Sequence, residues 1–589
     1  MATEALKDEG ASTAIRWRTF ARGYGPLVAV YLLATAFTDA YFMGDTADYV
    51  DSIVSFLGGQ NYKFWEFGHL FWRPLGWLLY EFSKPLTSFL GGGDVRLQVT
   101  VVLLALNWLA GLLSVCALYG TVRRLGGGSW TRGLVTGAFI FSNAFLNFTQ
   151  TGSSYIPGLS LLLLGLYILV RGGAHGEKSW APALLAGLAL AGAVCLWFPY
   201  VVAMPAAVVS PLLLFGFNRL RLRIVIVTGV TLAVVLAASY AAVLLGPLGI
   251  HTLAGFKAWM NAASHDMDNR GMTRAVFGLA RSFIYMGNDG VLFKRYILGD
   301  PFNRVTTLDL VRLSLLKFVL FYVCLASVVI NLLFSPRGRR MLGLLILTTV
   351  PMFWFAVSFD GGAVERYLPL YPAMFFALSV GLSGSRSMGF AKGVAYAFMG
   401  AVILTDAVAL AKPLLERQEE ATAGRVSEVV QRRKPDSRII TVTWQDELIN
   451  FSRSYPFHPL NRQGSLNIGA LVTPGTSFAG EWRRAFATDA LAAWRRGGEV
   501  WVSKRVLSAR PRPEWNWVEG DVKRVSWPDF RVFFSQMEIG ESAGGDDGFV
   551  LIPSTSGNRE YLEHMGTTKA ASLEVSRRPG ADNLILALN

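Results

Sequence analysis

Repeated apolar segments of membrane-spanning length constrain this chain more than any other feature. A helix needs about 20 mostly apolar residues to cross a bilayer, and eleven such segments precede residue 412. They predict a polytopic α-helical membrane protein with about eleven transmembrane helices, at residues 26–43, 97–119, 133–150, 155–170, 182–198, 200–216, 224–245, 311–334, 341–358, 367–383 and 393–411. The stretch 182–216 is too long for one helix, and Phe198-Pro199-Tyr200 is the natural place for it to fold back.

Positive charge supports this count and gives an orientation. The chain carries 55 Lys and Arg against 41 Asp and Glu, a net charge of +14, and the excess lies before residue 412. Basic residues in short alternate loops indicate the cytoplasmic side and contacts with anionic membrane lipids, rather than nucleic acid. Such residues precede the first segment and recur in every second loop, at Arg123, Arg124, Arg132, Arg171, Lys178, Arg219, Arg221, Arg223, Arg337, Arg339, Arg340, Arg386 and Lys392.

This alternation predicts the domain organisation of a protein of the inner cell membrane. Residues 1–25 form a cytoplasmic segment, 26–411 a transmembrane domain with external loops at 44–96 and 246–310, and 412–589 an extracytoplasmic, periplasmic domain. The short segment 74–90 is apolar but carries two charges, so we expect a helix at the membrane surface. The sequence pattern predicts that the last domain is a soluble α/β domain, with strands at Ile439–Thr443, Val500–Val506 and Phe549–Ile552 and a helix at Ala485–Arg495.

Three carboxylates at a spacing of three residues follow the first apolar segment. On a helix, Asp45 and Asp48 would share a face, with Asp51 one turn further along. Neighbouring carboxylates repel each other, which makes one of them a better proton acceptor and favours general-base catalysis. The alternative is a helix start whose acidic residues complement its dipole.

Two external turns combine a basic residue with aromatic residues and proline. In Phe67-Gly68-His69-Leu70-Phe71-Trp72-Arg73-Pro74, Arg73 opens an amphipathic segment at the level where a lipid phosphate would lie; ordinary interfacial snorkelling is the alternative. In the turn before residue 367, Arg366 is a candidate for phosphate and Glu365 for holding that arginine or binding sugar. An internal ion pair that fixes the turn is the alternative. Glu66 and His69 are candidates for sugar or acceptor contact.

The second external loop, 246–310, is unusually basic for that side of a membrane. Arg270 and Arg274 are four residues apart and would share a helix face, where their planar forks suit phosphate oxygens. His265, with Asp266 and Asp268, is a candidate for sugar or acceptor binding. Three ligands within four residues fit zinc poorly, so we predict no metal site. Solvated charge is the alternative for the whole loop.

Familiar soluble-enzyme motifs are missing from the sequence. It has no Walker-A loop, HExxH or GxSxG pattern. Its three cysteines lie inside apolar runs without metal-ligand spacing, so we expect buried thiols. Few charged residues lie in the middle of the apolar segments, and Lys317 and Asp406 lie near segment ends, which argues against an ion-coupled transporter.

The order Gly44-Asp45-x-x-x-Tyr49, a spacer, and then Arg73-Pro74-Leu75 with aromatic residues resembles the first external loop of GT-C glycosyltransferases. It is most similar to bacterial aminoarabinose transferases and protein O-mannosyltransferase-like enzymes. The resemblance implies that Asp45 is the catalytic acid and that Arg73 faces the lipid phosphate. The family's Asp-Glu pair is Asp45-Thr46 here, so a second acid would have to be Asp48.

The resemblance therefore implies an inverting glycosyltransferase with Asp45 as general base. It would move a sugar from a polyprenyl-phosphate-linked donor to an extracytoplasmic acceptor, which is a protein, lipid or glycan. No cofactor is expected, although the oligosaccharyltransferase branch of the family uses a divalent metal. Two alternatives stay open: a lipid-linked glycan flippase or carrier without catalysis, and a non-catalytic scaffold.

Overall fold

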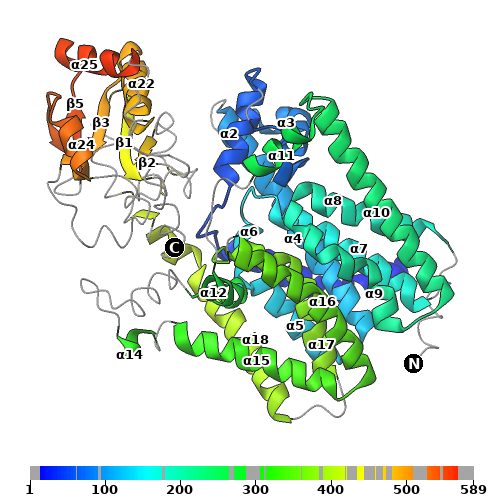
Figure 1. Ribbon diagram of the computed structural model, residues 1–589. Helices are drawn as coiled ribbons and strands as arrows, with labels where there is room; N and C mark the ends of the chain where they lie inside the picture. The colour runs from blue at the N-terminus through cyan, green and yellow to red at the C-terminus, as the bar shows by residue number, and fades with distance from the viewer. Residues whose placement is uncertain are drawn as a thin grey trace, which may run out of the picture. The chain divides into compact units, whose positions relative to one another are not determined.

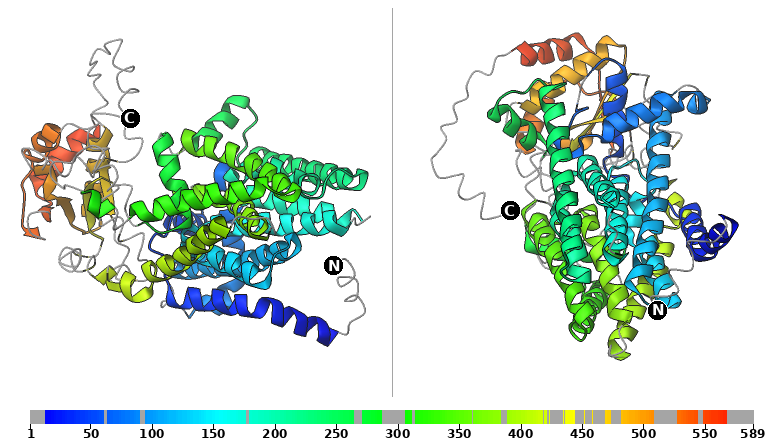
Figure 2. Two further views of the ribbon diagram at one scale, coloured as in Figure 1. Left: turned by 90° about the horizontal axis from the view of Figure 1, so that it is seen from below. Right: turned by 90° about the vertical axis from the view of Figure 1, so that its right-hand side faces the viewer.

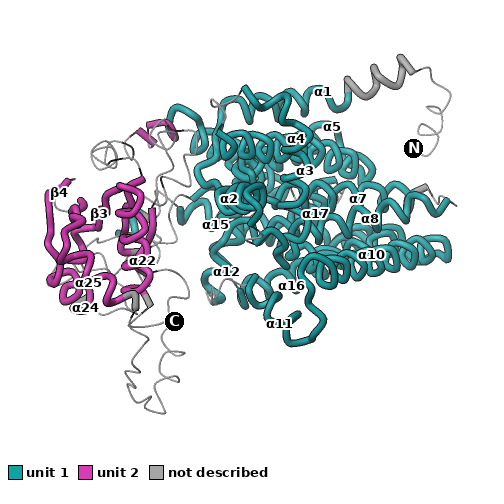
Figure 3. Tube along the Cα trace, turned by 90° about the horizontal axis from the view of Figure 1, so that it is seen from above, with its two compact units in different colours: residues 1–264, 268–298, 305–414 teal, residues 265–267, 299–304, 415–589 magenta. Residues whose placement is uncertain are grey.

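The computed structural model contains two compact units (Figure 3), each considered by itself. The first comprises Met1–Ser264, Asp268–Leu298 and Val305–Leu414, and the second comprises His265–Met267, Gly299–Arg304 and Leu415–Asn589. The structure describes residues 13–60, 63–89, 94–175, 179–263, 271–286, 306–310, 314–359, 361–383, 389–417, 419–420, 423, 434, 436–443, 451, 458, 468–472, 481–507, 527–543 and 548–567.

The first unit is built from helices (Figure 1). In chain order they are α1 (Thr13–Phe37), α2 (Thr46–Leu57), the 3₁₀ helix η2 (Phe67–His69), α3 (Trp72–Thr87), α4 (Val95–Leu125), α5 (Ser129–Phe141), α6 (Asn143–Phe148), α7 (Tyr155–His175), α8 (Ala181–Leu196), η4 (Phe198–Ala203), α9 (Met204–Phe215), α10 (Arg219–Leu245), α11 (Leu253–Ala262), α12 (Met272–Phe283), α14 (Thr307–Leu310), α15 (Leu316–Leu333), α16 (Pro336–Ser358), η6 (Val364–Leu370), α17 (Tyr371–Ser383) and α18 (Gly389–Ala409).

Membrane-spanning helices make up most of this unit. Seven helices among the described residues are long and apolar enough to cross a bilayer: Val95–Leu125, Tyr155–Ala174, Phe198–Phe215, Arg219–Leu245, Leu316–Leu333, Pro336–Ser358 and Gly389–Ala409. Two shorter apolar helices, Gly23–Phe37 and Ala181–Leu196, occupy further predicted segments. The chain is therefore a polytopic helical membrane protein, and helix is present in each of the eleven predicted segments.

Two of the predicted segments are broken, which is why they fall short as single spanning helices. Segment 133–150 is divided by Ser142, whose backbone is extended (φ −61°, ψ 136°) between α5 and α6. Segment 367–383 begins as the 3₁₀ helix η6 and continues as α17. The sequence also predicted that the chain turns back at residues 198–200. The helix is indeed interrupted there, since Trp197 is extended (φ −150°, ψ 107°) and Pro199 follows it. Proline has no backbone N–H to continue the helix that ends there.

Burial separates the central helices of the bundle from the peripheral ones. Every residue of α17 from Tyr371 to Leu382 is buried, as expected of a helix that is apolar all round. In contrast, α10 buries few residues and exposes Ile226, Val230 and Val234, so its outer face is apolar surface of the kind that contacts lipid. The long helices of this unit run alongside one another (Figure 2), and α7 packs against both α4 and α8.

The segment expected at the membrane surface is helix α3. Trp72, Gly76 and Tyr80 are buried along one face. Phe82 and Leu86 are 77% and 74% exposed on another. This amphipathic pattern suits a helix that lies in the interface.

The side chains of Asp406 and Lys317 both bind the backbone of one residue, Tyr285. Asp406 Oδ1 accepts a hydrogen bond from the Tyr285 backbone N–H at 2.8 Å, and Lys317 Nζ donates to the Tyr285 carbonyl at 2.9 Å. Asp406 and Lys317 thus both hold Tyr285, two residues after the end of α12, which gives these two side chains a structural role.

The second unit contains a five-stranded sheet in the order β2-β1-β3-β5-β4. Its strands are β1 (Arg438–Thr443), β2 (Ile468–Val472), β3 (Val500–Ser503), β4 (Ser542–Ala543) and β5 (Phe549–Ile552). The first three are parallel, and β5 is antiparallel to both β3 and β4. The accompanying helices are α22 (Glu481–Arg495), η7 (Lys504–Leu507), α24 (Trp527–Phe534) and α25 (Ser556–Thr567).

Sequence patterning located the core strands of this sheet but missed the edges. The runs predicted at residues 439, 500 and 549 correspond to β1, β3 and β5, although β3 ends at Ser503 and the chain continues as η7. The edge strands β2 and β4 were not predicted. β4 has only two residues, and neither strand has the long β-branched run that marks a buried strand.

Candidate functional site

The candidate site is built around Asp45, which lies just before α2. Gly44 precedes it in the left-handed region (φ +58°), and a Cβ added there would lie 2.8 Å from Ser153 Oγ. Only glycine fits this position without strain. Thr46 then fastens the turn to the start of α7, because its Oγ1 accepts the Gly152 N–H at 2.9 Å.

Two tyrosines hold one oxygen of the exposed Asp45 carboxylate. The Tyr155 hydroxyl donates to Oδ2 at 2.6 Å, and the Tyr49 hydroxyl lies 3.3 Å from the same oxygen. Oδ1 accepts no hydrogen bond from any described residue. The carboxylate is therefore fixed through one oxygen while the other is available to solvent or a ligand.

The sequence predicted that Asp45 and Asp48 stack on one helix face. The helix begins at Thr46, so Asp45 stands ahead of it and its neighbour one turn along is Tyr49. Asp48 lies in the first turn of α2, half-buried. Asp51 is exposed and forms an ion pair with Arg96 at the start of α4, with 2.6 Å between Oδ1 and Nη2.

Behind Asp45 is a buried polar chain from Tyr49 to His69 and Ser154. The Tyr49 hydroxyl lies 3.2 Å from the His69 ring nitrogens, and His69 Nδ1 lies 2.8 Å from Ser154 Oγ. Burial lowers the pKa of His69 to about 4, so the imidazole is neutral at physiological pH. Burial and the charge of Asp45 raise the pKa of Tyr49 well above its usual value, so the phenol stays a donor.

Arg73 lies beneath these side chains and is only 2% exposed. Its Nη1 contacts Glu66 Oε2 at 2.5 Å, and the guanidinium carbon lies 4.8 Å from the centre of the Tyr49 ring. Its Nε has no hydrogen-bond partner among the described residues. Arg73 is thus a buried, paired cation rather than the snorkelling side chain that its position in the sequence also allowed.

Arg366 reaches the same site from η6. Its guanidinium carbon lies 4.7 Å from the centre of the Phe359 ring and 5.8 Å from that of Trp197. Trp197 in turn packs against Tyr155, with 4.8 Å between the ring centres, so Arg366 adjoins the tyrosine that holds Asp45. The Nε atom of Arg366 is buried and, like that of Arg73, has no hydrogen-bond partner among the described residues. Glu66, Arg73, Asp45 and Arg366 are all charged neighbours of the His69 ring. The adjacent Glu365 is buried, and its charge acts on Tyr155.

Close backbone packing against α12 sets the position of η6. The Tyr367 hydroxyl lies 2.7 Å from the Ala275 carbonyl oxygen and 2.9 Å from the Gly361 carbonyl oxygen, so its one proton is shared between these two acceptors. Gly278 packs so tightly that an added Cβ would overlap the Gly361 carbonyl oxygen. Arg274, on the first turn of α12, is exposed.

Part of the predicted site lies outside the described residues. The residues concerned are His265, Asp266, Asp268 and Arg270, and the helix face expected to be shared by Arg270 and Arg274 therefore also lies outside the described residues. Among the residues that the structure does describe, no group of three or more His, Cys, Asp or Glu side chains is arranged to hold a metal ion.

Sequence reasoning missed Tyr155, Ser154 and Trp197. They lie at the ends of apolar segments, where polar and aromatic residues are common. Ser153-Ser154-Tyr155, a polar opening to a predicted transmembrane helix, was the available signal. It gave no indication of which external residue these side chains would meet.

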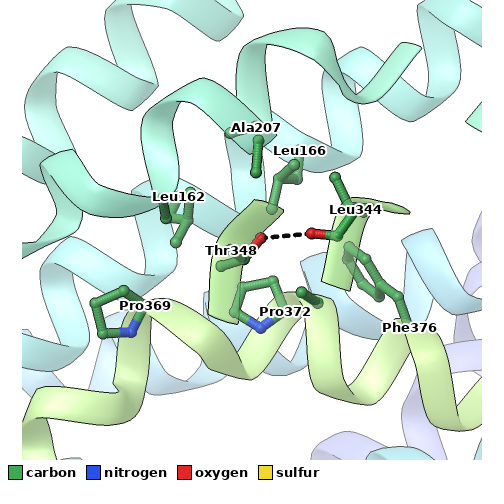
Figure 4. Close-up of a pocket in the computed structure, with 11 residues that line it drawn as sticks. Leu162, Leu166, Ala207, Leu344, Thr348, Pro369, Pro372 and Phe376 are labelled. Atoms are coloured by element: carbon green, nitrogen blue, oxygen red, sulfur yellow. Dashed lines mark hydrogen bonds between the residues drawn. The ribbon is translucent and has the colours of Figure 1, made fainter. Parts of the chain in front are cut away.

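A separate apolar pocket between α7, α9, α16, η6 and α17 is part of the packing and not a site (Figure 4). Leu162, Leu166 and Phe376 are among its lining residues, and its volume is about 10 Å³. That volume is near the lower limit for holding one water molecule. The hydroxyl of the lining residue Thr348 already has a partner, because its Oγ1 donates to the Leu344 carbonyl at 2.9 Å.

Comparisons with known proteins find similarity at the level of structure. No family model and no curated protein matches the sequence. ArnT from Cupriavidus metallidurans bound to undecaprenyl phosphate is similar at a TM-score of 0.48 and 13% identity, over 92% of this chain and 98% of that chain. The apo oligosaccharyltransferase of Archaeoglobus fulgidus gives 0.44 and 12%, over 89% and 73%.

A further solved structure is AglB of Archaeoglobus fulgidus in complex with an inhibitory peptide and a dolichol-phosphate. It is similar at a TM-score of 0.43 and 10% identity, over 90% of this chain and 74% of that chain. ArnT and AglB are GT-C glycosyltransferases, the family that residues 40–90 of this sequence resemble.

Proposed function

We propose that this protein is a GT-C glycosyltransferase that moves a sugar from a polyprenyl-phosphate-linked donor to a hydroxyl of an extracytoplasmic acceptor. The observation that carries the proposal is the exposed Asp45 carboxylate, which Tyr49 and Tyr155 hold by one oxygen, in a site that also contains Arg73 and Arg366. A fixed base beside clustered cations is the arrangement that transfer from a phosphate leaving group requires.

In the proposed reaction Asp45 acts as the general base. Its free Oδ1 takes the proton of the acceptor hydroxyl while the acceptor oxygen bonds to the anomeric carbon of the sugar. The bond between that carbon and the phosphate oxygen breaks on the opposite face, and its electron pair leaves with the phosphate. The anomeric carbon is therefore inverted. Asp48 remains the candidate for a second acid.

The arginines would stabilise the negative charge that grows on the leaving phosphate. Arg366 is the better placed for direct contact, because it is only half-buried. Arg73 is almost fully buried and paired with Glu66, so it supports the site as a fixed positive charge beneath Tyr49. The exposed Arg274 is a further candidate for the lipid phosphate.

Sugar and acceptor would contact the polar side chains around this carboxylate. His69 is neutral and linked to Tyr49 and Ser154, so it would hydrogen-bond a sugar hydroxyl without adding charge. Glu365 and Glu66 would position the two arginines. Asp51 and His265 complete the proposed set of sugar- and acceptor-binding residues.

Sugar transfer by the purified protein from a panel of radiolabelled polyprenyl-phosphate sugars tests this function. Asp45→Asn should lower turnover by roughly 10²–10⁴-fold, the usual contribution of a general base, with donor binding kept. Glu81→Gln is the matched control, because Glu81 is a partly exposed acid of the same predicted external segment and, among the described residues, forms its ion pair with Lys84. The same assay with EDTA tests whether a divalent metal takes part.

The outcomes separate the enzyme from its alternatives. Transfer that disappears in Asp45→Asn and survives EDTA supports a metal-independent enzyme. Transfer that EDTA abolishes would favour the oligosaccharyltransferase type. Donor binding without transfer in the wild type, unaffected by Asp45→Asn, would replace the enzyme by a lipid-linked glycan carrier.

The proposed orientation places the N-terminus in the cytoplasm and residues 412–589 outside it. Gln60 and Trp180 are exposed and belong to loops predicted on opposite sides of the membrane. In intact cells, a membrane-impermeant maleimide should label Gln60→Cys and leave Trp180→Cys unlabelled. The reverse result would invert the topology.

A further inference from the structure

An arginine-lined cavity lies at the other end of the helix bundle from Asp45. Helix α4 connects the two places: Arg96, near its start, pairs with Asp51, and Leu125, at its end, lines the cavity. Helix α4 has 31 residues. At a rise of about 1.5 Å per residue, it is about 46 Å long. The cavity is therefore distinct from the proposed catalytic site and adjoins the arginine-rich loops predicted to be cytoplasmic.

Three arginines from two helices line this cavity of about 250 Å³. Arg221 comes from the first turn of α10, and Arg337 and Arg340 come from the first turns of α16. The other lining residues are apolar: Leu125, Leu214, Phe215, Met341 and Val380. Three positive charges around one small space repel each other, so an anion bound between them would be stabilised.

Arg221 is held in place by backbone carbonyls. Its Nε donates to the Gly173 carbonyl at 3.0 Å, and its Nη1 donates to the carbonyls of Phe215 at 2.6 Å and Gly216 at 3.2 Å. These bonds fix the guanidinium without neutralising it by a carboxylate. A pre-positioned cation loses little conformational entropy when an anion binds.

Arg337 and Arg340 have no hydrogen-bond or ion-pair partner within the described part of the chain. Each lies over a glycine that ends a helix: a Cβ on Gly126 would be 3.3 Å from Arg337 Nη1, and one on Gly216 would be 3.7 Å from Arg340 Nη1. Both glycines have positive φ, at +92° and +82°. Two free planar forks beside a fixed one suit a tetrahedral phosphate, which accepts paired hydrogen bonds.

We propose that this cavity binds the phosphate of an anionic phospholipid, with the three guanidiniums on the phosphodiester and the acyl chains along the apolar wall. The lining is apolar apart from the arginines. Phe217 and Phe334, which lie beside its lining segments in the sequence, are 76% and 52% exposed. Exposed aromatic rings are expected where side chains meet lipid. A soluble phosphate would use the arginines but would leave the apolar wall without a partner.

Native mass spectrometry of the purified full-length protein, titrated with phosphatidylglycerol or phosphatidylcholine, tests the proposal. The wild type should retain phosphatidylglycerol in preference to phosphatidylcholine. Arg337→Gln combined with Arg340→Gln should weaken that retention roughly twenty-five-fold, at about fivefold for each basic residue near a lipid surface. Arg337→Lys with Arg340→Lys keeps the charge without the fork and should fall between the two.

Arg339→Gln is the matched control, because Arg339 is exposed on the same helical turn but does not line the cavity. It should change retention by less than about threefold. An equal loss in this control would overturn the proposal in favour of general surface attraction. Equal retention of phosphatidylcholine would overturn it because the cavity would then not select an anionic lipid. Displacement of the lipid by millimolar inorganic phosphate, again dependent on Arg337 and Arg340, would identify a soluble phosphate as the ligand instead.

Discussion

The Tyr155 hydroxyl lies 2.6 Å from Asp45 Oδ2, although 110 residues separate the two in the sequence. This hydrogen bond ties the turn before α2 to the first residue of α7. It leaves Asp45 Oδ1 without a partner among the described residues, so the carboxylate has one structural oxygen and one reactive oxygen. The first prediction follows from that division.

Tyr155→Phe should lower turnover about tenfold and leave the affinity for the donor nearly unchanged. The ring still fills its place, but the carboxylate loses the hydrogen bond that orients it, which is worth about 1.5–3 kcal/mol for a charged acceptor. Steady-state kinetics with varied donor gives kcat and KM separately. Tyr167→Phe, on the same helix beside Arg124, is the control and should behave as wild type. A change in KM alone would remove Tyr155 from the orienting role.

His69 should make stability depend on pH below neutrality. Its pKa is about 4 in the folded protein, against about 6.5 in the unfolded chain, so the unfolded state binds the proton first. This contribution is complete above about pH 6.5 and is lost as the pH falls towards 4. Its size is at most about 3 kcal/mol.

Thermal unfolding of the purified protein between pH 4 and pH 8 measures this effect. His69→Gln should remove most of the slope between pH 6.5 and pH 4. His251→Gln should keep the slope, because His251 is exposed. A wild-type slope that survives the loss of His69 would assign it to other groups.

Glu66→Gln should destabilise the protein by about 3–5 kcal/mol, because it leaves the buried Arg73 without its counter-charge. Replacing both residues, as Glu66→Gln with Arg73→Met, should recover much of that loss, since no unpaired charge then remains. Thermal or denaturant unfolding checks the stabilities. If the double variant is as unstable as the single one, the loss has another cause than the unpaired arginine.

Gly278→Ala should separate α12 from the turn that carries Arg366. A methyl group there would overlap the Gly361 carbonyl oxygen, so the backbone must move. We expect about 1–3 kcal/mol of destabilisation and turnover lowered by about tenfold or more, because Arg366 shifts with the turn. Gly343→Ala in α16, which has open space around it, should leave both unchanged. Normal turnover in Gly278→Ala would show that this packing does not set the site.

The sequence indicated the membrane segments because the bilayer imposes a local requirement. Each segment such as 224–245 must be apolar by itself, and the basic loops beside it are read without knowing any contact. It could not show that segments 133–150 and 367–383 are broken, because Ser142 and the 3₁₀ geometry of η6 are settled by packing. Asp45 was also selected from local features, namely the spacing of three carboxylates and the resemblance carried by Gly44-Asp45-x-x-x-Tyr49.

The partners of Asp45 were decided only by the tertiary structure. Spacing along the chain suggested a neighbouring carboxylate, Asp48, but helix α2 begins one residue after Asp45 and α7 brings Tyr155 to it instead. His69 meets Ser154 across 85 residues, and Arg366 approaches from a late turn that α12 holds in place. Hydropathy is a property of each segment alone. The side chains that meet at a helix end depend on how all the segments pack, and no local pattern encodes that arrangement.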